Sequence, residues 1–150
     1  MIIEDLKTWR MQFPENRKLV VTNGCFDVLH AGHVDYLERS KAFGDYLLVG
    51  INNDESVKAL KGYSRPINNE FYRSYVLDNL KFVDFVYIFD GVRCVDFLDQ
   101  SKPHVYTKGG DYSIDSLHKG ELKALMAHQT QINIIKLKYN ISTTSILSRI

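Results

Sequence analysis

Residues 22–33 read Thr-Asn-Gly-Cys-Phe-Asp-Val-Leu-His-Ala-Gly-His, directly after the apolar run at 18–21 and directly before a segment with helical spacing. A strand that passes through glycine-bearing turn residues into a helix leaves several backbone N–H groups unpaired, at the point where the helix dipole is positive. His30 and His33 lie three residues apart across the helix start, so both imidazoles can face the same side. The stretch therefore predicts a phosphate-binding turn with two titratable donors.

Short apolar runs alternate with helical stretches along the rest of the chain. The apolar runs are largely continuous rather than alternating, as expected where helices cover both faces of a parallel sheet. The pattern predicts a doubly wound, Rossmann-like α/β fold with a parallel five-stranded sheet, in which ligands bind beyond the carboxyl ends of the strands. Strands are expected at 18–22, 46–51, 84–89, 105–107 and 132–137, and helices at 3–13, 33–43, 70–80, 93–101, 115–127 and 143–150.

The composition is typical of a globular protein with one core. The chain has 150 residues, of which 45% are hydrophobic, and no repeat or linker interrupts it, so residues 1–150 are expected to form a single domain. Nineteen Lys and Arg residues against eighteen Asp and Glu residues give a formal net charge of +1. Bulk electrostatic attraction to nucleic acid or to a membrane is therefore not indicated.

The N-terminus and the cysteines point to an intracellular protein. The first residues lack a basic leader and an apolar signal core, and nowhere do about eighteen apolar residues run together, so a cytoplasmic protein is expected. Cys25 and Cys94 have no paired short spacing, which argues against a disulfide framework and a thiolate zinc site.

Residues 24–33 resemble the signature of the cytidylyltransferase-like nucleotidyltransferases, which carry a His-x-Gly-His motif. Further matches follow in order at 57–62 with 65–68, at Arg73, at 108–112 and at 142–146. Together they resemble the heptose 1-phosphate adenylyltransferases, which make nucleotide-activated heptose for lipopolysaccharide core or related polysaccharide. The resemblance extends over nearly the whole chain.

The resemblance implies a transfer reaction in which a sugar 1-phosphate oxygen attacks the α-phosphorus of a nucleoside triphosphate and pyrophosphate leaves. ATP is the expected nucleotide and a heptose 1-phosphate the expected acceptor. Because a phosphate monoester has a second pKa of about 6, the nucleophile is already largely ionised at neutral pH and needs no general base. Mg²⁺ is expected with the triphosphate, and no protein side chain is assigned as a metal ligand. A homodimer is consistent with the resemblance, but the sequence itself does not demonstrate one.

Four residues are the candidate catalytic groups. His30 and His33 are the expected donors to the triphosphate, with the second histidine nearest the α-phosphate by resemblance. By resemblance, Lys61 reaches the phosphates of both substrates, and Thr143 lies at a second helix start that can bind phosphate. The alternatives for the histidines are a metal-binding pair, or a turn-capping role for His30. For Asp27, a structural role in the turn is expected.

The remaining candidates are expected to bind the nucleotide and its phosphates. They are backbone groups of the first turn, cations on the following segment and helix, a glycine-rich motif after the fourth strand, and hydroxyls before the last helix. For Lys58 a solvated surface position is an equal alternative, and for Arg73 an ordinary helix ion pair. The set is Thr22, Asn23, Gly24, Cys25, Phe26, Lys58, Arg65, Arg73, Lys108, Gly109, Asp111, Ser142 and Thr144.

Two other functions remain open. A glycerol-3-phosphate cytidylyltransferase-like enzyme using CTP shares the first motif and the ending at 141–144, whereas the residues at 108–111 favour the heptose enzymes. A non-catalytic nucleotide-binding module is the alternative from another class. Histidines placed as donors to the transition state argue against it, because a pure binder gains little from them.

Overall fold

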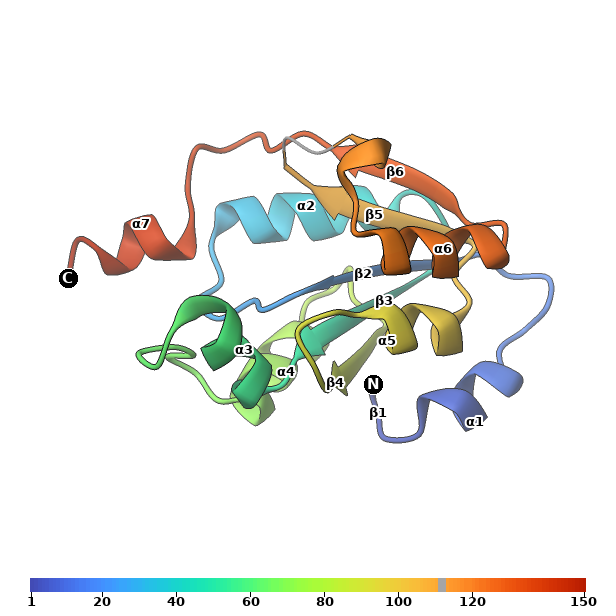
Figure 1. Ribbon diagram of the computed structural model, residues 1–150, viewed down its shortest axis with the longest axis horizontal. Coiled ribbons are helices and arrows are strands. Elements are labelled where there is room, and N and C mark those ends of the chain that lie inside the picture. Colours follow the sequence, from blue (N-terminus) through green and yellow to red (C-terminus); the bar gives the residue numbers. More distant parts are fainter. Residues whose placement is uncertain (111–112) are drawn as a thin grey trace.

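Six parallel strands form one sheet in the order β1-β4-β3-β2-β5-β6 in the computed structural model, which describes residues 1–110 and 113–150 (Figure 1). The order reverses beside β2, with β3 on one flank and β5 on the other. Ligands bind at such a switch point in doubly wound sheets. The strands are β1 (Ile2–Ile3), β2 (Leu19–Gly24), β3 (Tyr46–Asn52), β4 (Phe85–Phe89), β5 (Val105–Gly109) and β6 (Gln131–Ile135).

The predicted parallel, doubly wound sheet is confirmed, but the prediction of five strands is wrong by one. Ile2 and Ile3 pair with Val86 and Tyr87 of β4 and extend the sheet at its edge. A strand of two residues is too short to show a periodicity of its own, so the sequence pattern merged it with the helix expected at 3–13. That helix, α1, covers only Leu6–Met11.

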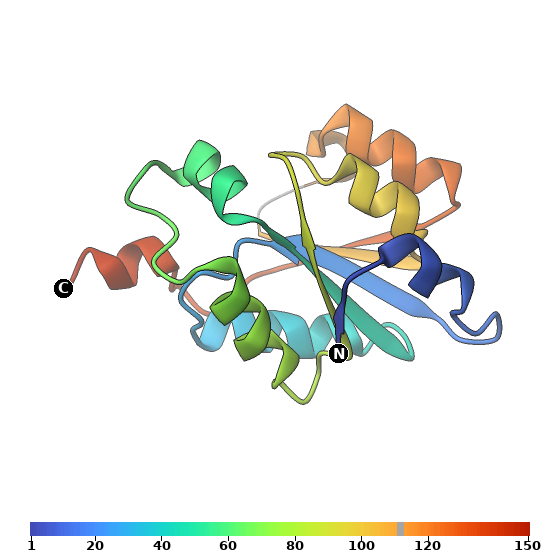
Figure 2. The same ribbon diagram turned by 90° about the horizontal axis from the view of Figure 1, so that it is seen from below.

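Helices cover both faces of the sheet (Figure 2). On one face lie α1, α5 (Val95–Ser101) and α6 (Lys119–Ala127), which pack a core that includes Leu6, Phe97 and Leu125. On the other face lie α2 (Ala31–Lys41) and α4 (Glu70–Asp78), with Leu37 and Leu77 in a second core. This two-sided burial is why the strand sequences are continuously apolar. No helix in the described part of the chain is long and apolar enough to cross a membrane.

The segment after β3, in which no helix was expected, is largely helical. Helix α3 (Asp54–Lys61) begins behind Asn53, whose side chain accepts from Ser56 N, and ends at Gly62 with φ 101°. Asp54 and Glu55 lie in the first turn of α3, where their negative charges stabilise the positive end of the helix dipole. Lys58 and Lys61 therefore lie on a helix, and only the segment after them is a loop. At the C-terminus, η1 (Ile114–Ser116) precedes α6, and α7 is confined to Thr143–Leu147.

Candidate active site

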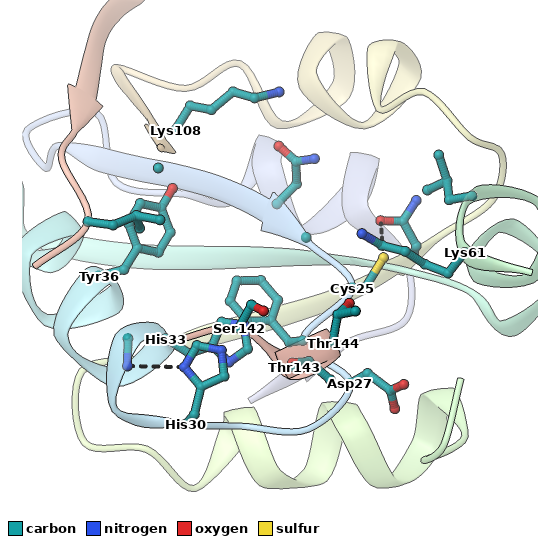
Figure 3. A pocket seen from close by; sticks show the side chains of 18 of the residues that line it. Cys25, Asp27, His30, His33, Tyr36, Lys61, Lys108, Ser142, Thr143 and Thr144 are labelled. Atoms are coloured by element: carbon teal, nitrogen blue, oxygen red, sulfur yellow. Dashed lines mark hydrogen bonds between the residues drawn. The ribbon is translucent and has the colours of Figure 1, made fainter. Parts of the chain in front are cut away.

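A cleft of about 530 Å³ lies at the carboxyl ends of the central strands (Figure 3). That volume is within the range of small-molecule sites. Its lining comes from the β2–α2 turn, the end of α3, the β4–α5 turn, β5, the start of α6 and the segment 137–144. The cleft thus draws on both helical layers and on nearly the whole length of the chain.

His30 begins α2 by capping its first turn. Its Nδ1 accepts a hydrogen bond from Gly32 N at 3.1 Å. In a neutral ring this acceptor role places the proton on Nε2, which is left as a donor for a ligand. A side chain at Gly32 would lie 2.9 Å from the His30 ring, so the glycine is what lets the imidazole fold back over the helix start. His30 therefore caps the helix, as one of the alternatives predicted, and its Nε2 remains a donor for a ligand.

The His33 ring stacks on the His30 ring, with centroids 3.8 Å apart and an interplanar angle of 22°. Burial lowers the pKa of His33 to about 4, with the His30 ring adding to the effect, and burial also lowers the pKa of His30. Both rings are therefore neutral in the ligand-free cleft at neutral pH. His33 Nδ1 is buried without a hydrogen-bond partner among the described residues. Such an atom is normally satisfied by water or by a ligand.

The last helix is joined to the first turn through hydroxyl groups. Thr143 Oγ1 donates to Val28 O at 3.0 Å, across 115 positions of sequence. Ser142 and Ser145 form a reciprocal capping box, so the Ser142 hydroxyl is used within α7. Thr144 also lines the cleft and is exposed. The start of α7 is therefore held beside the β2–α2 turn, on the same side of the cleft as the histidines.

Asp27 ties the loop after α3 to the β2–α2 turn. Its carboxylate accepts from Arg65 Nε at 2.7 Å, from Ile67 N at 2.8 Å and from Asn68 N at 2.9 Å. Burial raises the pKa of Asp27, but the bonds from the two amides and from Arg65 outweigh it and hold the pKa below its usual value. The structural role expected for Asp27 is thus observed, with partners about forty residues away rather than in its own turn.

Arg73 is placed differently from the expected phosphate ligand. The residue is 1% exposed, and its guanidinium donates to Cys25 O at 2.8 Å, Asn68 O at 3.0 Å and Asp54 Oδ1 at 2.8 Å. It does not line the cleft. Arg73 instead fixes the turn at Cys25 from behind, against α3 and the following loop.

Two other candidates also lie off the cleft. Thr22 is fully buried and donates to Thr107 O at 3.0 Å, so its hydroxyl stabilises the sheet. Lys58 pairs with Glu55 on the exposed side of α3 at 3.4 Å, which agrees with the surface alternative. Asp111 lies outside the described residues. The cleft brings the other candidates together: His30, His33, Lys61, Thr143, Asn23, Gly24, Cys25, Phe26, Arg65, Lys108, Gly109, Ser142 and Thr144.

Sequence reasoning missed several lining residues. Tyr36 lies one helical turn after His33, and Asn52 ends a strand beside β2, so helical spacing and the strand-end rule could have found both. Arg93 and Glu121 could not be found from a local motif. The packing of α5 against α6 brings these two residues to the cleft. Gly32 and Asp27, which belong to the first motif but had no binding role assigned to them, also line the cleft. The apolar lining residues that were not predicted are Leu60, Val92, Leu137, Tyr139 and Ile141.

The described residues offer no ready-made metal centre. No group of three or more His, Cys, Asp or Glu side chains among them could hold an ion. The Asp27 carboxylate is already taken up by protein donors.

A family model described as Cytidylyltransferase-like matches residues 21–149. Among curated proteins, "Bifunctional protein HldE" of Aliarcobacter butzleri is 43% identical over 134 residues, which are 89% of this chain and 27% of that protein. HldE of Pseudomonas fluorescens (strain ATCC BAA-477) is 47% identical over 135 residues, which are 90% of this chain and 28% of that protein. The chain thus spans less than a third of the length of these relatives.

Solved structures share the fold. The lipopolysaccharide core biosynthesis protein from Thermoplasma volcanium has a TM-score of 0.66 and 27% identity, and the match covers 84% of this chain and all of that one. Pantoate-beta-alanine ligase from Francisella tularensis also has a TM-score of 0.66, over 98% of this chain and 75% of that one. At 14% identity, the second match shows the fold alone.

Proposed function

The chain belongs to the cytidylyltransferase-like family and is a nucleotidyltransferase domain, and from that premise we propose that it transfers AMP from ATP to a heptose 1-phosphate. A phosphate oxygen of the sugar attacks the α-phosphorus, the bond from that phosphorus to the bridging oxygen breaks, and pyrophosphate leaves with the electron pair. The sequence motifs and the HldE relatives support the heptose acceptor. The proposed location is the cytoplasm, where ATP is available.

One observation carries the proposal. His30 with its Nε2 donor, the His33 ring stacked on it and the start of α7 meet at one cleft. Because no general base is needed, the site has to position the triphosphate and neutralise charge as it builds on the transferred phosphoryl group and on pyrophosphate. The two imidazoles serve the α-phosphate, and the hydroxyl of Thr144 and the backbone at α7 serve the outer phosphates.

Lys61 and Arg65 line the cleft and supply positive charge from α3 and the loop that follows it. Lys61 ends α3 and Arg65 is held on the adjoining loop by Asp27. Their proposed role is to neutralise the phosphates of both substrates as they come together. Mg²⁺ bound to the triphosphate supplies further charge neutralisation there.

The test is a substrate matrix. ATP, CTP, GTP and UTP are each incubated with heptose 1-phosphate or with glycerol 3-phosphate, and pyrophosphate is measured. We expect pyrophosphate release with ATP and heptose 1-phosphate at a kcat/KM at least tenfold above that of every other pair. Preference for CTP with glycerol 3-phosphate would instead establish the cytidylyltransferase alternative. Nucleotide binding without release in any combination would establish a binding module.

A further inference from the structure

The side of the cleft formed by the α5 and α6 layer carries polar groups to which the proposed phosphate chemistry gives no role. Arg93 lines the cleft from the β4–α5 turn and Glu121 lines it from the first turn of α6. His30 and His33 belong to α2, on the opposite face of the sheet (Figure 2). The cleft therefore has two chemically different sides, one with imidazoles and hydroxyls and one with the Arg93 guanidinium, the Glu121 carboxylate and the Lys108 ammonium.

Arg93 and Glu121 are neighbours in space. Cys94 N donates to Glu121 Oε1 at 3.4 Å, so the peptide that follows Arg93 lies against the carboxylate. Glu121 is 6% exposed, yet its side chain borders the cleft. A carboxylate offers about four acceptor sites, so this long hydrogen bond leaves capacity for a ligand's hydroxyl groups.

The Arg93 guanidinium is available to a ligand. Arg93 is exposed, and none of the hydrogen bonds or ion pairs found among the described residues involves its side chain. A guanidinium has five N–H donors in a planar fork that matches two oxygens of a phosphate. Its turn is anchored by Asn52, whose Nδ2 donates to Gly91 O at 3.4 Å.

Asn23 extends the same surface at the end of β2. Its Oδ1 accepts from the Tyr106 hydroxyl, so its amide nitrogen is left as a donor for the cleft. Donors from Arg93 and Asn23 beside the acceptor Glu121 suit a ligand that combines a phosphate with several hydroxyls.

We propose that Arg93 and Glu121 form the acceptor subsite, in which Arg93 binds the phosphate of a sugar phosphate and Glu121 accepts hydrogen bonds from its hydroxyls. This inference rests on the proposed function for the identity of the reaction. Both residues act on binding and take part in no bond change. The subsite selects a polyhydroxylated acceptor over a small phosphate such as glycerol 3-phosphate, because the hydroxyls satisfy a buried carboxylate.

Steady-state kinetics of Arg93→Ala and Glu121→Gln test the subsite. Each variant should raise KM for heptose 1-phosphate at least about tenfold, as expected for the loss of a hydrogen bond to a charged group. KM for ATP should stay within about twofold of the wild-type value, which also shows that the variants fold. The matched controls are Arg17→Ala and Glu15→Gln, at exposed positions outside the cleft. A rise in KM for ATP, or no change in either constant, would overturn the assignment.

A binding measurement separates this inference from the proposed function. Calorimetry with a non-hydrolysable ATP analogue present measures the affinity for heptose 1-phosphate and for glycerol 3-phosphate without turnover. Arg93→Ala should weaken both ligands, whereas Glu121→Gln should weaken only the heptose. If the wild type binds heptose 1-phosphate, the variants show these losses of affinity and no pyrophosphate is released, the proposed function is wrong and the subsite is supported. If pyrophosphate is released but neither variant changes the affinity for heptose 1-phosphate or glycerol 3-phosphate, the proposed function is supported and the subsite is wrong.

Discussion

His33 is the residue on which the proposed chemistry depends most. Its ring packs between His30 and Phe26, with centroids 3.8 and 5.3 Å away, so its orientation is set before a ligand binds. Such preorganised donors cost no rearrangement when charge develops in the transition state.

Replacing His33 with Ala should therefore lower kcat for adenylyl transfer by about a hundred- to a thousandfold, as for other preorganised oxyanion donors. The dissociation constant for ATP should rise far less, because the donor acts mainly in the transition state. Pyrophosphate release and equilibrium ATP binding measure the two effects. The control is His128→Ala, at the C-terminal end of α6 and outside the cleft. Equal losses of kcat and of ATP affinity in His33→Ala would contradict the assignment.

The low pKa of His33 also makes folding depend on pH. Burial lowers the pKa to about 4 from the ordinary value of 6.5, so between these pH values the unfolded chain binds more protons than the folded one. The free energy of unfolding should fall as the pH drops through this window, by at most about 3 kcal/mol from this group. Urea unfolding of the wild type and of His33→Asn at pH 7 and pH 4.5 measures it. Equal losses in the two proteins would contradict the assigned pKa.

The role of a site residue could be predicted where its partners are close to it in the sequence. His30, His33 and Gly32 form a local unit, and their placement at the cleft followed from the strand, turn and helix pattern. Arg73 is the opposite case, because its partners at Cys25 and Asp54 lie 48 and 19 positions away. Nothing adjacent to Arg73 distinguishes a buried guanidinium from a phosphate ligand.

At the level of elements, the loop after α3 depends on a single carboxylate. Asp27→Asn removes the charge that holds Arg65, Ile67 and Asn68. The amides of residues 67 and 68 should then exchange at least about tenfold faster, as hydrogen bonds to a charged group are lost. Hydrogen exchange by mass spectrometry measures it, with Asp99→Asn as the control. Unchanged protection of this loop would show that Asp27 does not hold it.

Arg73 should contribute to stability rather than to ligand affinity. Arg73→Met leaves Asp54 and two carbonyls without their donor, and it should lower the free energy of unfolding by about 3–5 kcal/mol, as when one partner of a buried ion pair is lost. Urea denaturation measures the loss, and Arg17→Met on the exposed surface is the control. A stable variant with strongly reduced ATP affinity would restore the phosphate-ligand assignment.

The elements that the sequence did not predict are those with the least local signal. β1 has two residues and gains its strand character from pairing with β4. α3 has eight residues, and its lysines and glycine resemble a polar loop until the Asn53 cap is recognised. The longer strands and the helices α2 and α4 were predictable, because each repeats one apolar pattern over a buried face.

At the scale of the whole molecule, the sheet order places β2 between the two halves of the fold, and its carboxyl end opens into the cleft. The α2 layer contributes the imidazoles, and the α5 and α6 layer contributes Arg93 and Glu121. The first of these sides was predictable from a contiguous motif. The second arises only from tertiary packing, which is why no sequence pattern indicated it.

A crystal structure of the protein with a non-hydrolysable ATP analogue and Mg²⁺ would show directly whether the two imidazoles and the start of α7 bind the triphosphate. The α-phosphate should lie within hydrogen-bond distance of both His30 and His33, and the outer phosphates should lie against residues 142–144. A triphosphate bound away from the two imidazoles and from the start of α7 would contradict this prediction.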